Sequence, residues 1–138
     1  MHDILSQQMK DEVTRHGVTE LSTPEDVDEV LKTSKGTVLV FVNSNCGCAG
    51  GVARPALRKA MQHAWVPDKI TTVFASGDRE ATARAREYFV AQPPSSPSFA
   101  LLREGRLVQM IHRSDIEAST PDNVAALLTH MFDTYCKT

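Results

Sequence analysis

The 138-residue sequence lacks most of the features that place a protein in a specialised class. Fifteen basic and seventeen acidic side chains leave a net charge of −2, so there is no basic surplus for binding nucleic acid. No apolar run approaches the roughly 18–20 residues that a membrane span requires. The segment from Met1 to Lys10 shows no basic stretch followed by an apolar one, the pattern of an export signal. We therefore expect neither nucleic acid nor a membrane among the partners.

The composition otherwise matches an ordinary globular protein. Apolar residues make up 41% of the chain and charged residues 23%, which argues against intrinsic disorder. A chain of this length has the size of one domain and leaves no room for a second. Residues 1–138 are therefore expected to form a single domain.

Cysteine is scarce as well, with three residues in the chain: Cys46, Cys48 and Cys136. An odd number of cysteines without a disulfide scaffold favours a reducing compartment, so we expect a cytoplasmic protein. In that compartment, two cysteines separated by a single residue, here Gly47, are more often reactive or metal-binding than structural. The pair is the strongest local sign of chemistry in the sequence.

Apolar periodicity and turn residues predict a chain that alternates helices with strands. Thr23 and Pro24 mark one helix start, because threonine caps free amides and proline suits the first helical turn. Pro55 should kink the helix after the cysteines, because it has no N–H to donate to the Gly51 carbonyl. The expected elements are helices over 3–16, 24–34, from 50 onward, 78–90 with Asp78 as its cap, and from 120 onward, buried strands over 37–42 and 70–75, and a hairpin of strands 98–103 and 106–112.

This order of elements predicts the fold class. Parallel strand–helix–strand units followed by a hairpin and a final helix place helices on both faces of a central mixed sheet. The fold is therefore α/β and resembles the thioredoxin-like arrangement, with the cysteine pair after a central strand and a proline before the hairpin.

Cys46 lies where a strand ends and a helix begins. Only the thiolate of cysteine is a nucleophile, and free backbone N–H groups at a helix start stabilise an anion. Arg54, one to two turns along the helix, is expected to add positive charge. These features favour Cys46 as the attacking thiol and Cys48 as the resolving thiol.

Gly47 is expected to permit backbone angles that a side chain would forbid. A disulfide across one intervening residue closes a small, strained ring, and strained disulfides exchange readily. The pair is therefore expected to release a small thiol rather than to form a long-lived bridge.

Two alternatives to redox chemistry remain open at this point. The pair could bind metal together with Cys136, although zinc needs four ligands and no histidine lies within five residues of the pair. The cysteines could also be inert core thiols in a non-catalytic module. Cys136 itself, three residues from the end of the printed sequence, is expected to be an exposed or half-buried thiol without a role.

Pro97 lies between a proline-rich loop and an apolar strand. Such a proline is often simple punctuation, but in a thioredoxin-like fold the same position holds a cis-proline that faces the cysteines. A cis X–Pro bond is uncommon and its use is usually deliberate. We therefore expect a cis bond between Ser96 and Pro97.

At this level of detail the sequence resembles the bacilliredoxin family, small bacterial thioredoxin-fold proteins with a Cys-X-Cys site. The resemblance spans nearly the whole chain. The matching segments are 43–51 (Asn-Ser-Asn-Cys-Gly-Cys-Ala-Gly-Gly), 53–55 (Ala-Arg-Pro), 72–75 (Thr-Val-Phe-Ala), 80–83 (Glu-Ala-Thr-Ala), 86–89 (Arg-Glu-Tyr-Phe), 94–98 (Pro-Ser-Ser-Pro-Ser), 100–102 (Ala-Leu-Leu), and Phe132 and Asp133 with Cys136.

The resemblance implies a thiol–disulfide oxidoreductase that removes bacillithiol, a cysteine-containing small thiol, from oxidised proteins. By position, Cys46 attacks the protein–bacillithiol disulfide and takes the small thiol, and Cys48 resolves it. No bound cofactor is expected; bacillithiol, or the small thiol that the host uses in its place, is the co-substrate. A disulfide isomerase or reductase acting on proteins is the alternative, since weak isomerase activity accompanies the family.

Roles are also expected for residues around the thiols. We expect Gly47, Arg54 and Pro55 to support the site, and Asn45, Ser96 and Pro97 to contact substrate. The chain departs from the family pattern at three positions: Asn45 replaces an apolar residue, His112 a proline and Ser114 a histidine. These changes affect the expected substrate preference and leave the expected thiol chemistry unaltered.

Overall fold

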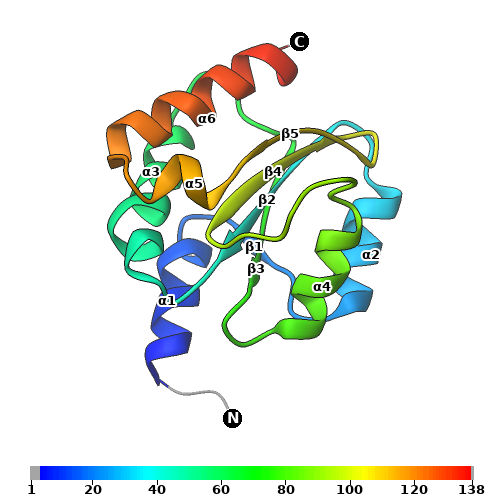
Figure 1. The fold of residues 1–138 in the computed structure, drawn as a ribbon. Coiled ribbons are helices and arrows are strands. Elements are labelled where there is room, and N and C mark those ends of the chain that lie inside the picture. Colours follow the sequence, from blue (N-terminus) through cyan, green and yellow to red (C-terminus); the bar gives the residue numbers. More distant parts are fainter. Residues whose placement is uncertain (1–3, 138) are drawn as a thin grey trace.

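A computed structural model describes residues 4–137 and shows a mixed five-stranded sheet with helices on both faces (Figure 1). In chain order the elements are α1 (Ile4–Thr14), β1 (Thr19–Glu20), α2 (Pro24–Thr33), β2 (Thr37–Asn43), the π-helical turn η1 (Ala49–Ala53), α3 (Arg54–Ala60), β3 (Lys69–Phe74), α4 (Arg79–Glu87), β4 (Ser98–Arg103), β5 (Arg106–Ile111), α5 (Arg113–Ile116) and α6 (Pro121–Tyr135). The order of strands in the sheet is β1-β3-β2-β4-β5.

Strand β2 is the centre of the sheet and is buried along its whole length. It runs parallel to β3 and antiparallel to β4, which in turn pairs with β5 in the predicted hairpin. A nearly continuous run of β-branched and apolar residues is typical of a strand that is covered on both faces. Phe41 on β2 stacks on Phe99 on β4, with ring centroids 4.7 Å apart.

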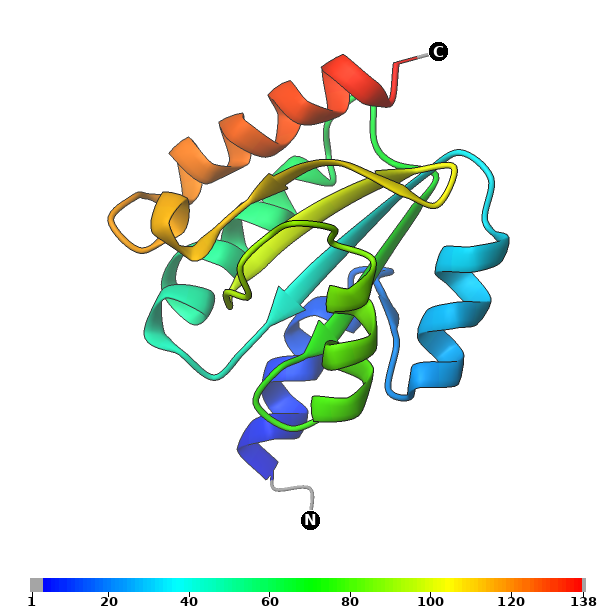
Figure 2. The ribbon, with the colours of Figure 1, turned by 45° about the vertical axis from the view of Figure 1, so that its right-hand side comes forward.

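The helices form two layers (Figures 1 and 2). Helices α1, α3, α5 and α6 pack on one face of the sheet, against side chains that include Leu39, Phe41 and Leu101. Helices α2 and α4 pack on the other face, against Val40 and Val73 among others. The predicted α/β, thioredoxin-like class is therefore correct.

The predicted helix starts are confirmed at two positions. The side chain of Thr23 accepts a hydrogen bond from the Asp26 amide at 3.1 Å, and α2 begins at Pro24. Thr120 caps α6 in the same way, accepting from the Asn123 amide at 3.2 Å. Each cap satisfies an amide that has no carbonyl partner within its helix.

Other local predictions need correction. Asp78 stands before α4, but its side chain makes no capping bond; it pairs with the buried Lys10 ammonium at 2.8 Å. Pro55 lies within a helical segment that runs from Gly47 to Ala60, and the α-helical bonding is interrupted just before it by the π turn η1, where the Arg54 amide donates to the Ala49 carbonyl. The helix expected over 3–16 ends at Thr14, and Asp3 lies outside the described residues.

Two elements were not expected at all. Strand β1 has two residues and helix α5 has four, lengths at which apolar periodicity carries no signal. Within residues 4–137, no helix has both the length and the apolar character needed to cross a membrane.

Candidate functional site

The cysteine pair lies in the turn that joins the carboxyl end of β2 to η1. This turn is held by the Arg54 guanidinium, which donates from Nη1 to Asn43 Oδ1 and to the Ser44 carbonyl oxygen, both at 2.9 Å. Asn43 Oδ1 also accepts from the Ser44 amide at 2.9 Å. The backbone before Cys46 is therefore anchored to a buried side chain of the following helix.

Both thiols are free and partly exposed, and their Sγ atoms lie 2.7 Å apart. The Cys46 amide donates to Ser44 Oγ at 3.3 Å, while the Cys46 carbonyl accepts from the amides of Ala49 and Gly50 at 3.1 and 3.3 Å. The turn thus places the second thiol within hydrogen-bond distance of the first.

The surroundings of the two thiols shift their pKa values in opposite directions. Burial pushes the pKa of Cys46 upward, but the thiol of Cys48, the backbone amides of Cys48 and Ala49, and the charge of Arg113 outweigh it and lower that pKa. For Cys48, burial raises the pKa, and the hydrogen bond and charge of Cys46 raise it further. This asymmetry favours Cys46 as the thiolate and Cys48 as the thiol that donates to it.

The expected charge contribution of Arg54 is not found. Arg54 is 7% exposed, and its Nε is paired with the Glu12 carboxylate at 2.7 Å. The cation that acts on both sulfurs is instead Arg113, the first residue of α5. Arg54 therefore shapes the turn, and the charge of Arg113 is the smallest of the effects that lower the pKa of Cys46.

Sequence reasoning missed Arg113 because the contact joins positions far apart in the chain on a helix too short to show a pattern. It also missed Gly50. A Cβ atom at Gly50 would lie 2.8 Å from Arg54 Nη2, so glycine makes room for the guanidinium. The signal available in the sequence was a glycine four residues before an arginine, beside the cysteine pair.

The backbone of the dithiol form does not explain glycine at position 47. In this dithiol form Gly47 has a negative φ, and a Cβ placed there would meet no atom within 4 Å. The turn of the dithiol form therefore does not itself require glycine at this position, and the expectation that Gly47 permits the backbone angles of the Cys46–Cys48 disulfide stays a prediction.

The loop before β4 lies beside the thiols, because Ser98 pairs with Val42 at the end of β2. The Ser96–Pro97 peptide is cis, as expected, and Pro97 is buried. The Ser95 carbonyl accepts from Ser98 Oγ at 3.0 Å, and the Ser96 carbonyl accepts from Arg113 Nη1 at 3.2 Å. The structure therefore brings the cysteine turn and the proline loop to one end of the sheet.

His112 fixes the other side of this loop. Its Nδ1 lies 2.9 Å from Ser95 Oγ, and its Nε2 lies 2.8 Å from Gln92 Oε1. Arg86 Nη2 adds a bond to the Ser95 carbonyl at 3.2 Å. Asn45 is exposed, and its backbone N–H donates to Ser76 Oγ at 3.0 Å. This bond does not use the Asn45 side chain.

Cys136 differs from its predicted environment. It is 8% exposed, thus buried, and burial raises its pKa. It interacts with Thr37, the first residue of β2, whereas the pair follows the last. A seven-residue strand spans about 23 Å, so Cys136 cannot join the pair in a shared metal site within one chain.

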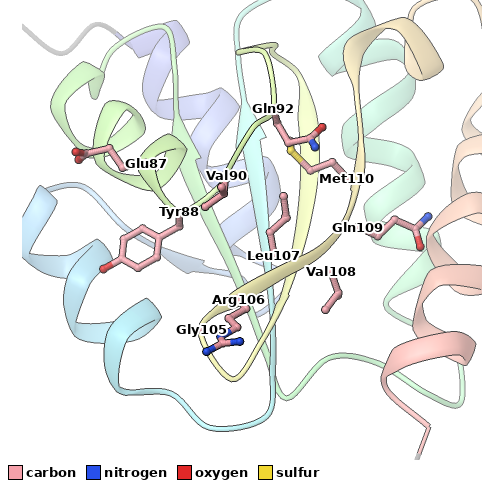
Figure 3. A pocket seen from close by; sticks show the side chains of 10 residues that line it. All are labelled: Glu87, Tyr88, Val90, Gln92, Gly105, Arg106, Leu107, Val108, Gln109 and Met110. Carbon is pink, nitrogen blue, oxygen red and sulfur yellow. The ribbon is translucent and has the colours of Figure 1, made fainter.

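Within residues 4–137, no group of three or more His, Cys, Asp or Glu side chains is placed to hold a metal ion. A hollow of about 580 Å³ runs along the edge strand β5 (Figure 3). A second one of about 290 Å³ shares Gln92 and Met110 with it and extends to Ser95. Neither hollow is lined by Cys46 or Cys48. The partly exposed thiols therefore lie outside both hollows.

Comparisons with known proteins show which proteins the chain is similar to. The model of the family described as "Disulphide isomerase" matches residues 1–136. A bacilliredoxin of Geobacillus kaustophilus is 52% identical over 137 residues, covering 99% of this chain and 94% of its own. A bacilliredoxin of Koribacter versatilis is 52% identical over 134 residues, covering 97% of this chain and 92% of its own.

Among solved structures, the fold is similar to that of Fasciola hepatica thioredoxin, with a TM-score of 0.58 and 19% identity over 86% of this chain and 99% of that one. The thioredoxin of Malassezia sympodialis gives a TM-score of 0.58 and 17% identity over 83% of this chain and 90% of that one. These likenesses show the fold alone. The family model and the half-identical relatives show more: the chain belongs to the bacilliredoxin family and is a thiol–disulfide oxidoreductase.

Proposed function

We propose that the protein removes bacillithiol, or the small thiol that the host uses in its place, from mixed disulfides on oxidised proteins. The observation that carries the proposal is the pair of Sγ atoms 2.7 Å apart, with the pKa of Cys46 lowered and that of Cys48 raised. An attacking thiol needs to be a thiolate, whereas a resolving thiol needs to wait protonated within reach. The half-identical relatives carry the name bacilliredoxin, which supports the same reaction here.

In the first step the Cys46 thiolate attacks the small-thiol sulfur of the mixed disulfide. A new S–S bond forms between Cys46 and the small thiol, the original S–S bond breaks, and the client cysteine leaves as a thiolate that takes a proton from water. No electrons leave the system, because one mixed disulfide has replaced another. The partly exposed position of Cys46 leaves it accessible to a disulfide on a protein surface.

In the second step Cys48 attacks the Sγ of Cys46, and the small thiol leaves as a thiolate. Once Cys46 is part of a disulfide, its negative charge no longer raises the pKa of Cys48, so Cys48 loses its proton more readily. The product is the Cys46–Cys48 disulfide, and the two electrons now reside on the released thiols. A thiol reductant must return the pair to the dithiol form before the next cycle.

The experiment uses a protein carrying bacillithiol on a single cysteine, with release of the small thiol measured by mass spectrometry. Cys46→Ser should abolish release, and Cys48→Ser should accumulate Cys46 joined to bacillithiol. Cys136→Ser is the matched control, since that thiol lies at the other end of β2, and it should release bacillithiol at the wild-type rate. Bacillithiol on Cys48, with Cys46 dispensable, would reverse the assignment of roles.

The second candidate is a disulfide isomerase or reductase for proteins. The description of the matching family model as a disulphide isomerase favours it. The two activities are separated by rates on a scrambled disulfide protein and on a bacillithiolated protein at equal enzyme concentration. Faster action on the scrambled protein would make isomerisation the principal activity. In either case the proposed location is the cytoplasm, where a free dithiol persists.

A further inference from the structure

Outside the cysteine turn, Arg113 contacts the proline loop that lies beside the thiols. It lies two residues after the end of β5, where Ile111 pairs with Phe99, and Phe99 in turn pairs with Phe41 of β2. The cysteine turn, the proline loop and the start of α5 therefore leave neighbouring strands at the same end of the sheet. Figures 1 and 2 show α5 beside both η1 and the loop that precedes β4.

The guanidinium of Arg113 has two partners. Nη1 donates to the carbonyl oxygen of Ser96 at 3.2 Å, and Nε donates to Glu117 Oε2 at 3.1 Å. The side chain is 46% exposed, so its charge is neither buried nor fully screened. Ser96 is the residue before the cis-proline, which means that the arginine holds the backbone of the loop facing the thiols.

We propose that Arg113 is the positioning residue of the redox site, which stabilises the thiolate of whichever cysteine is attacking while it holds the Ser96 carbonyl. The inference rests on the proposed function in taking Cys46 and Cys48 as successive nucleophiles. Because the charge of Arg113 acts on both sulfurs, it favours the Cys46 thiolate in the first step and the Cys48 thiolate in the second. Glu117 shares the guanidinium and so weakens its effect.

The other basic side chains near the site have partners elsewhere. Arg54 is paired with Glu12, and both ring nitrogens of His112 lie against Ser95 and Gln92. Arg86 donates to the Ser95 carbonyl oxygen. Among the described residues, only Arg113 combines a bond to the proline loop with an electrostatic effect on both thiols.

The test measures the rate of alkylation of Cys46 by iodoacetamide against pH in the full chain, with the modified residue located by fragment mass spectrometry. At low salt Arg113→Gln should raise the apparent pKa of Cys46 by a few tenths of a unit, the order of effect expected of one exposed charge acting through water. Glu117→Gln should lower it, and Arg113→Lys should keep most of the wild-type value because the charge remains. High salt should shrink all three differences.

Arg106→Gln removes the same charge from the exposed start of β5, at the far end of the hairpin, and is the control. The proposal is overturned if Arg113→Gln shifts the Cys46 profile no more than Arg106→Gln does, or if Arg113→Lys behaves like Arg113→Gln. If Arg113 were only structural, its substitutions would change the stability of the protein, but the apparent pKa of Cys46 would not depend on the charge at position 113. The alkylation rate needs no disulfide substrate, so failure of dethiolation with a normal Arg113 effect would contradict the proposed function alone.

Discussion

The two ends of strand β2 place a cysteine in opposite surroundings. At the carboxyl end, Cys46 is partly exposed and is met by the Cys48 thiol, two backbone amides and a nearby arginine charge, which together lower its pKa despite burial. At the amino end, Cys136 is buried against Thr37, and burial raises its pKa. The same side chain is therefore a nucleophile at one end of the strand and a packing residue at the other. The difference lies in donors and exposure, not in residue type.

The turn at the carboxyl end of β2 depends most on Arg54. Replacing this residue should therefore have the largest effect on stability and on the reactivity of Cys46. Arg54→Met removes three hydrogen bonds and takes the arginine away from the Glu12 carboxylate, Asn43 Oδ1 and the Ser44 carbonyl oxygen. We expect a loss of about 2 to 3 kcal/mol in the free energy of unfolding, together with slower alkylation of Cys46 as the turn loosens. Urea unfolding measures the first and alkylation the second.

Arg58→Met is the matched control, because Arg58 lies on the same helix with its side chain exposed. It should change the free energy of unfolding by less than about 0.5 kcal/mol. Equal losses for the two variants would show that Arg54 does not hold the cysteine turn.

Alanine substitutions at two glycines near the thiols should differ in their effect on stability by a smaller amount. At Gly50 an added Cβ would press on Arg54 Nη2 at 2.8 Å, whereas at Gly47 it would meet nothing within 4 Å. Gly50→Ala should therefore be less stable than Gly47→Ala by about 1 to 2 kcal/mol, since alanine otherwise costs a turn or helix nothing. Thermal and urea unfolding of the two variants side by side measure the difference. If the two substitutions have the same effect, Gly50 does not make room for Arg54.

At the amino end of β2, Cys136 should give the smallest effect on the free energy of unfolding, and only at alkaline pH. The pKa of Cys136 is raised in the folded state, so the unfolded chain loses its thiol proton first as pH rises above about 8.5. The unfolded state then binds fewer protons, and stability falls with pH by about 1 kcal/mol near pH 9.5. Cys136→Ala should be insensitive to this change. The free energies of unfolding of wild type and variant, measured at pH 7.5 and 9.5, should converge; a constant gap would contradict the buried, protonated thiol.

The sequence was sufficient for features that depend on local chemistry. Thr23 and Thr120 cap helices, the run from Thr37 forms the central strand, and Glu104 with Gly105 turns the hairpin. The cysteine pair at the strand end and the cis bond before Pro97 were also predictable, once the order of elements indicated the fold.

What could not be predicted depends on side chains that meet across long stretches of chain. Arg54 reaches Glu12, 42 positions away, and Arg113 reaches Ser96, 17 positions away. A charge near a cysteine in sequence is therefore a poor guide to the charge near it in space. The expected cation, Arg54, is neutralised by a partner from α1, whereas the effective one comes from a four-residue helix that no periodicity reveals.

The measurement that tests the account most directly is the pH dependence of alkylation at Cys46 and Cys136 in the same wild-type molecules. We predict that Cys46 reacts with an apparent pKa below the ordinary value of about 8.5 for a free thiol, and that Cys136 reacts more slowly at every pH. An apparent pKa for Cys46 at or above that of a free thiol would contradict the central claim that the turn after β2 holds an activated nucleophile.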